Sequence, residues 1–99
     1  GLIMGVKVYL NRNFPMSLLI NTVVEITKDL NYVGTLTVEN EFVVMDVLEG
    51  VFKKFQLQEE YLGIILPRSL SVGDVLSVRL SEDFCTKFYL IDNVGFKKL

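Results

Sequence analysis

Short runs of β-branched and aromatic residues recur about every 8–12 residues along the chain, and clusters of Asn, Asp, Gly and Glu separate them. This spacing is typical of antiparallel all-β domains, whose strands are short and joined by tight turns. We therefore expect a mainly β fold, a small antiparallel barrel or sandwich-like domain of up to eight short strands. The expected strands are residues 6–10, 21–27, 32–38, 42–48, 51–57, 62–66, 75–80 and 87–91.

The turn chemistry supports several of the joints between these strands. Gly73 and Asp74 are turn residues that lead into the run Val75–Leu80. Since strand side chains alternate between two faces, Leu76, Val78 and Leu80 share one face of that strand, and Ser77 and Arg79 share the other. Glu49-Gly50 is predicted to be a second turn, between residues 42–48 and 51–57.

The segment 15–30 has two interpretations. Its β-branched residues between positions 20 and 27 favour a strand. The spacing of Leu19, Val23, Ile26 and Leu30 is that of one face of a helix, with Pro15 near its first turn. The second interpretation gives an alternative fold, an α+β domain with one helix at about 15–30 packed on an antiparallel sheet.

The length of the chain, 99 residues, is that of a single domain. Residues 1–3 fit a cloning remnant before a native Met4. Apolar runs are interrupted well before the 18 or more residues that a membrane helix needs, so we expect no membrane span. There is one cysteine, which excludes an intrachain disulfide and favours a cytoplasmic setting. The complete absence of alanine fits an AT-rich coding sequence, as in some viruses and phages.

The absence of histidine removes the commonest general base and zinc ligand, so triads and histidine-containing metal sites are excluded. With one cysteine, Cys-rich metal sites are excluded as well. The glycines form neither a P-loop nor a dinucleotide-binding fingerprint. We therefore expect a protein that is not an enzyme and has no cofactor.

Aromatic residues next to lysines are the pattern of a surface that stacks nucleic-acid bases. The net charge of −2 provides no long-range attraction to nucleic acid, so such binding needs a local patch. The candidate binding surface consists of Phe52, Lys53, Lys54, Phe55, Lys87 and Tyr89.

One stretch resembles a known family. Residues 63–78 carry Pro67-Arg68 after a strand-like run and Gly73-Asp74 before the next, and they resemble the swapped-hairpin domain of AbrB-type transition-state regulators. The resemblance implies a DNA-binding dimer. Together with residues 45–50, the same stretch also resembles small uncharacterised bacterial β-domains.

The expected function is that of a non-enzymatic binding or assembly module that acts through protein–protein contacts. The alternative is a small β-barrel that binds nucleic acid. We also expect a homodimer, because strands such as residues 42–48 are apolar on both faces. A single sheet buries only one face of each strand, so a second copy of the chain is the simplest cover for the other.

Overall fold

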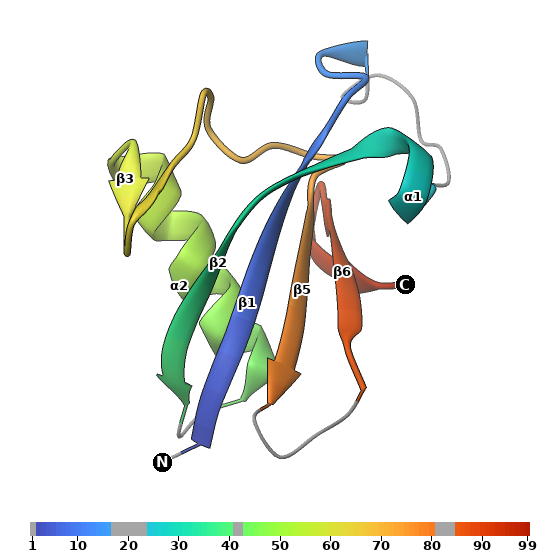
Figure 1. Cartoon of the computed structure of the whole chain (residues 1–99). Helices are drawn as coiled ribbons and strands as arrows, with labels where there is room; N and C mark the ends of the chain where they lie inside the picture. Colours follow the sequence, from blue (N-terminus) through green and yellow to red (C-terminus); the bar gives the residue numbers. More distant parts are fainter. Residues whose placement is uncertain (1, 17–23, 41–42, 81–84) are drawn as a thin grey trace.

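A computed structural model describes residues 2–16, 24–40, 43–80 and 85–99. It contains a five-stranded antiparallel sheet with strand order β2-β1-β5-β6-β7 (Figure 1). The strands of this sheet are β1 (Leu2–Asn11), β2 (Leu30–Asn40), β5 (Val75–Leu80), β6 (Lys87–Asp92) and β7 (Gly95–Lys98). Strands β3 (Glu60–Tyr61) and β4 (Ile64–Ile65) form a separate small hairpin. The prediction of a mainly β, antiparallel domain is confirmed.

The strands predicted at residues 42–48 and 51–57 are wrong, because one helix, α2 (Val44–Leu57), takes their place. Residues 41 and 42 lie outside the described residues. The helix buries one stripe of side chains, spaced three or four residues apart, so that all of them face the sheet. Glu49 and Gly50 lie on its exposed side and form no turn. The stripe consists of Val47, Leu48, Val51 and Phe55, with Val44 and Phe52 partly buried beside them.

The segment 15–30 is described only at its two ends. A single helical turn, α1 (Ile26–Asp29), precedes β2, and residues 24 and 25 before it are not in a strand, so the strand predicted at 21–27 is wrong over 24–27. Residues 17–23, where most of either interpretation falls, are not described. The α+β alternative is correct in having a helix packed on an antiparallel sheet, and among the described residues that helix lies at 44–57.

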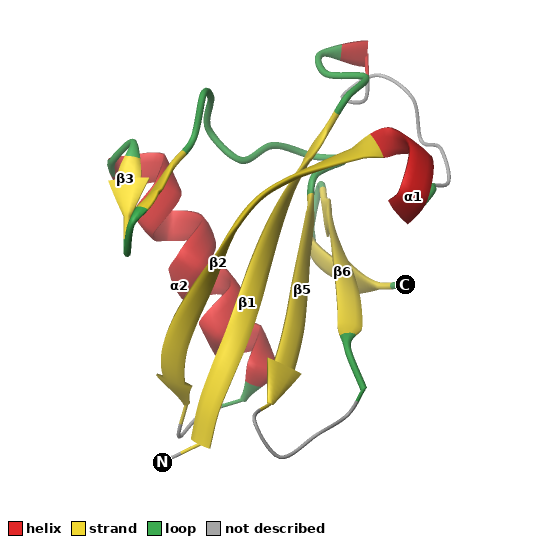
Figure 2. Ribbon diagram, viewed as in Figure 1, coloured by secondary structure: helices red, strands yellow, loops and turns green. Residues whose placement is uncertain are grey.

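The core lies between α2 and one face of the five-stranded sheet (Figure 2). Strands β1 and β5 at the middle of the sheet contribute side chains that are almost fully buried, and α2 contributes Leu48, which is 0% exposed. The core side chains of the central strands are Met4, Val6, Val8, Leu76 and Val78. The second layer that covers this sheet is therefore a helix rather than a second sheet. In the view of Figures 1 and 2, α2 lies behind the sheet, so the opposite face is turned to the reader.

A β-bulge in the β1–β2 pair decides which side chains of β2 reach each face. Val8 pairs with Gly34, but the next residue, Tyr9, pairs with Tyr32, so Val33 is the extra residue. An extra residue shifts the alternation of the strand by one position. Val33 consequently packs against the core, and Tyr32 lies beside Tyr9 on the face turned away from α2.

The remaining predicted strands are largely confirmed. Residues 75–80 form β5, residues 6–10 and 32–38 lie within β1 and β2, and residues 87–91 lie within β6. The run 62–66 is reduced to the two residues of β4. Gly73 adopts a φ of 98°, which supports the predicted turn before β5. Among the described residues, the helices are too short or too polar to cross a membrane.

Candidate binding site on the open face of the sheet

We call the face of the five-stranded sheet that is turned away from α2 the open face. Strand register arranges its side chains in rows that run across β2, β1, β5 and β6. Residues directly opposite each other in neighbouring strands point to the same side. One row is Tyr32, Tyr9, Val75 and Leu90, the next is Thr35, Lys7, Ser77 and Phe88, and the third contains Thr37, Gly5 and Arg79.

Three aromatic side chains form a continuous cluster on this face. The ring centroid of Tyr9 lies 5.7 Å from that of Tyr32 and 6.1 Å from that of Phe88, with tilted rings in both pairs. Tyr32, at the edge of the sheet, is 56% exposed, and its hydroxyl hydrogen bonds with the hydroxyl of Thr35. The open face therefore presents aromatic surface to solvent on its β2 side.

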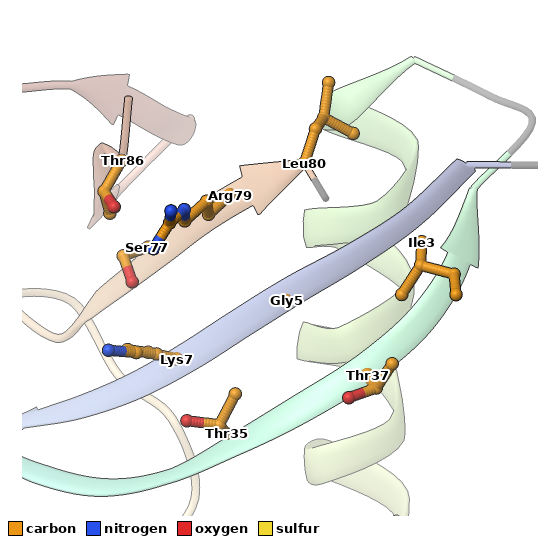
Figure 3. Close-up of a pocket in the computed structure, with 9 residues that line it drawn as sticks. All are labelled: Ile3, Gly5, Lys7, Thr35, Thr37, Ser77, Arg79, Leu80 and Thr86. Atoms are coloured by element: carbon orange, nitrogen blue, oxygen red, sulfur yellow. The ribbon is translucent and has the colours of Figure 1, made fainter. Parts of the chain in front are cut away.

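A hollow of about 260 Å³ lies beside this aromatic cluster (Figure 3). Its floor is Gly5, in the middle of the central strand β1, where a side chain would otherwise fill the space. We call it the Gly5 hollow. Its lining residues are Ile3, Gly5, Lys7, Thr35, Thr37, Ser77, Arg79, Leu80 and Thr86.

The lining of the Gly5 hollow has a different charge from the chain as a whole. The chain has 12 acidic and 10 basic residues, but the lining contains Lys7 and Arg79 and no carboxylate among its described residues. Its other polar groups are the hydroxyls of one serine and three threonines. Lys7 and the surrounding hydroxyls favour an anionic ligand, because the low-dielectric walls strengthen the local field.

Ser77 is a buried polar residue of this lining. Its side chain is 1% exposed, between Lys7 on β1 and Phe88 on β6. The serine hydroxyl makes no hydrogen bond to any other residue in the part of the chain that the structure describes. A buried hydroxyl without a partner costs about 1–3 kcal/mol, so this group is available to a ligand or to water.

The six residues of the sequence-predicted surface do not come together on one face. Phe55 and Tyr89 are buried in the core, at 3% and 7% exposure, and present no ring to a ligand. Phe52 is half-buried and packs edge-on against Phe96, at 6.3 Å between centroids. Lys53 and Lys54 are exposed on α2, behind the sheet, and Lys87 is exposed at the start of β6.

The Pro67-Arg68 and Gly73-Asp74 motifs form a structural clasp. Asp74 is 0% exposed, and its carboxylate accepts two hydrogen bonds from the Arg68 guanidinium, each of 2.7 Å. It also accepts the backbone N–H groups of Asn11, at 2.7 Å, and Ser71, at 2.8 Å. The guanidinium carbon lies 3.9 Å from the ring centroid of Phe14. These hydrogen bonds hold the loop before β5 against the end of β1.

Sequence reasoning missed Lys7, Tyr9, Tyr32 and Gly5 as members of a site. The alternation in residues 75–80 did place Ser77 and Arg79 on one face, opposite the apolar side chains. Alternation in β1 likewise separates Lys7 and Tyr9 from Val6 and Val8, and this signal was available. Within the described ranges, no group of three acidic or cysteine side chains is placed to hold a metal ion.

The open face combines aromatic rings, lysine and arginine side chains, and hydroxyls, which are groups that bind ligands. Comparison with protein-family models, curated protein sequences and solved structures gives no match.

Proposed function

We propose that the protein is a non-enzymatic binding module that binds single-stranded nucleic acid on the open face of its sheet. The observation that carries the proposal is the contiguity of the aromatic cluster and the cationic Gly5 hollow on one face. The cytoplasmic setting inferred from the single cysteine is part of the same proposal.

Single strands are bound without strong sequence preference by surfaces that stack bases on aromatic rings and attract the backbone with cations. The open face has both components. Tyr32 exposes ring surface, Tyr9 and Phe88 are half-buried beside it, and Lys7 lies with its ammonium nitrogen 5.9 Å from the Tyr32 ring centroid. A base stacked on such a ring contributes about 1–3 kcal/mol.

The charge of the whole chain opposes this binding, so the interaction must be local. Glu39 pairs with Ile3 in the register of β1 and β2, and it lies beyond the Gly5 hollow on the open face. We expect the bound strand to pass over the aromatic cluster and the hollow and to avoid this carboxylate. The part of the open face that remains for binding is small, so we expect a dissociation constant in the micromolar range or weaker.

The test is fluorescence anisotropy with labelled oligothymidylate and oligouridylate of about 12 nucleotides, within the range of site sizes for small β domains. Tyr32→Leu should weaken binding about tenfold, because leucine retains apolar surface but provides no ring for stacking. The matched control is Phe52→Leu, which changes an aromatic residue on the side of α2 and should leave binding unchanged. Absence of binding, or equal effects of the two variants, would contradict the proposal.

Assembly through protein contacts, with a homodimer as its simplest form, is a second proposal. Exposed apolar side chains at the end of α2 and on the β3–β4 hairpin favour it. Strand β3 lies next to α2 (Figure 1). Leu57, Leu62 and Ile65 are 81%, 55% and 65% exposed. Light scattering at micromolar concentration tests it: a species of about twice 11.3 kDa supports the dimer, and one of 11.3 kDa contradicts it.

A further inference from the structure

The two edges of the five-stranded sheet differ in how well they are protected from pairing with another strand. β7, at one edge, is four residues long and carries Lys97 and Lys98. Short length and lysine side chains are devices by which natural sheets keep an edge from pairing. β2, at the other edge, is 11 residues long and contains no lysine, arginine or proline. The β2 edge therefore lacks the protection that the β7 edge has.

The outer side of β2 has backbone groups that a further strand can satisfy. In an edge strand, every second residue directs its N–H and C=O groups away from the sheet. Within residues 2–16, 24–40, 43–80 and 85–99, no backbone hydrogen bond joins the outer side of β2 to another segment. The β3–β4 hairpin contacts β2 near Gly34 through Ile64, but it belongs to a separate sheet. These backbone groups are therefore open to pairing.

The regular part of β2 is the segment 34–40. The bulge at Val33 interrupts the ladder before this segment, and from there to the end of the strand each residue has one partner in β1. Leu36 is buried and Val38 is partly buried on the side of the core, and Thr37 between them is exposed on the open face. Seven residues match the usual length of a strand in a sheet. Thr37 is the middle residue of this segment.

The segment is complementary to a second copy of itself. Two antiparallel copies related by a two-fold axis at Thr37 place residue 37 opposite itself, residue 35 opposite 39 and residue 36 opposite 38. On the open face, two threonines then meet, and the Thr35 hydroxyl can donate to the carboxylate of Glu39. On the side of the core, Leu36 lies opposite Val38. The two Glu39 carboxylates stay four positions apart, about 14 Å along the strand, so like charges do not meet.

We propose that β2 pairs antiparallel with β2 of a second copy of the chain, with the two-fold axis at Thr37, so that the two sheets join into one continuous sheet. The inference rests on the homodimer proposed above and gives it a defined interface. The occupant is a second copy rather than an unrelated strand, because the segment complements itself at every position from 35 to 39. The open faces of both copies then lie on the same side of the joined sheet.

The first experiment tests the two-fold axis by disulfide cross-linking. Thr37→Cys in a Cys85→Ser background places two thiols opposite each other, because directly opposite residues have Cα atoms about 4.5–5.5 Å apart, within the range of a disulfide. Mild oxidation at micromolar concentration should convert most of the chain to a covalent dimer. The matched control is Thr27→Cys in the same background, an exposed residue of α1 that should remain largely uncross-linked. Equal cross-linking of the two variants would overturn the proposal.

The second experiment weakens the interface with charge. Thr37→Lys places two ammonium groups opposite each other, and like charges at opposite positions destabilise a strand pair. Light scattering over a range of concentrations should show that the dissociation constant of the dimer rises at least about tenfold. Thr27→Lys makes the same change on α1 and should leave this constant unchanged. Circular dichroism verifies that each variant is folded, and if Thr37→Lys is unfolded, the cross-linking yield of Thr37→Cys decides the question.

The results separate a failure of the interface from a failure of the homodimer. A dimer that Thr37→Lys weakens and that Thr37→Cys cross-links supports the proposal. A dimer that Thr37→Lys leaves intact and that Leu57→Asp dissociates would refute pairing through β2, while the homodimer stands. A species of 11.3 kDa at every concentration would refute both the interface and the homodimer, and would leave the β2 edge to a strand of a different protein.

Discussion

Arg68 and Asp74 form an ion pair with two parallel hydrogen bonds of 2.7 Å, and the carboxylate is completely buried. The pair joins the loop before β5 to the end of β1, because the same carboxylate accepts the backbone N–H of Asn11. The Asn11 side chain donates in turn to the carbonyl of Gly73, at 3.0 Å. The clasp lies at the end of the β1–β5 pair, the same pair in which Lys7 is opposite Ser77.

The first prediction concerns the clasp. Asp74→Asn should lower the free energy of unfolding by about 3–5 kcal/mol, because it leaves a partly buried guanidinium without its counter-charge. Urea denaturation followed by circular dichroism measures the change. Asp46→Asn, an exposed aspartate in the first turn of α2, is the matched control and should cost less than about 1 kcal/mol. An equal decrease in the free energy of unfolding for the two variants would show that Asp74 does not stabilise the fold in this way.

The second prediction compares two glycines. Gly50→Ala should stabilise the protein by about 0.5–1 kcal/mol, because alanine has the higher helix propensity and its Cβ would meet nothing within 4 Å. Gly34→Ala should destabilise it, because its Cβ would lie 3.0 Å from two side-chain carbons of the buried Ile64. Thermal and urea unfolding of both variants measure whether each substitution raises or lowers the free energy of unfolding. The same sign for both would contradict the placement of α2 or of the β4 strand against β2.

The third prediction concerns the β3–β4 hairpin. Leu62 and Gly63 form its two-residue turn with φ values of 48° and 84°, and leucine is strained in this region. Leu62→Asn creates the Asn-Gly pair that such turns favour, so we expect a stabilisation of about 1 kcal/mol. A loss of stability on urea unfolding would indicate instead that the exposed leucine makes contacts in the native state, as it would in a homodimer.

The helix α2 could have been predicted from the sequence. The apolar positions 44, 47, 48, 51, 52 and 55 are separated by steps of three, one, three, one and three, which is a helical stripe. The β-branched and aromatic character of these residues favoured strands, and Glu49-Gly50 resembled a turn between them. Packing against the sheet outweighed that local preference, because the stripe buries one continuous face.

The open face could be predicted only in part. Alternation within residues 75–80 is a local pattern, and it correctly put Ser77 and Arg79 on one face. The neighbours of those residues are set by strand order, in which β1 lies between β2 and β5 although most of the chain separates β1 from β5. The bulge at Val33, which brings Tyr32 beside Tyr9, depends on pairing between strands and has no local signal.

The salt dependence of binding tests most directly whether the open face binds single strands. If Lys7 neutralises one phosphate, a plot of log K against log salt concentration for oligothymidylate should have a slope of about −0.7. Lys7→Ala should reduce the magnitude of the slope by about 0.7, and Lys53→Ala, on the exposed side of α2, should leave it unchanged. No measurable binding, or a slope that Lys7→Ala does not alter, would contradict the account.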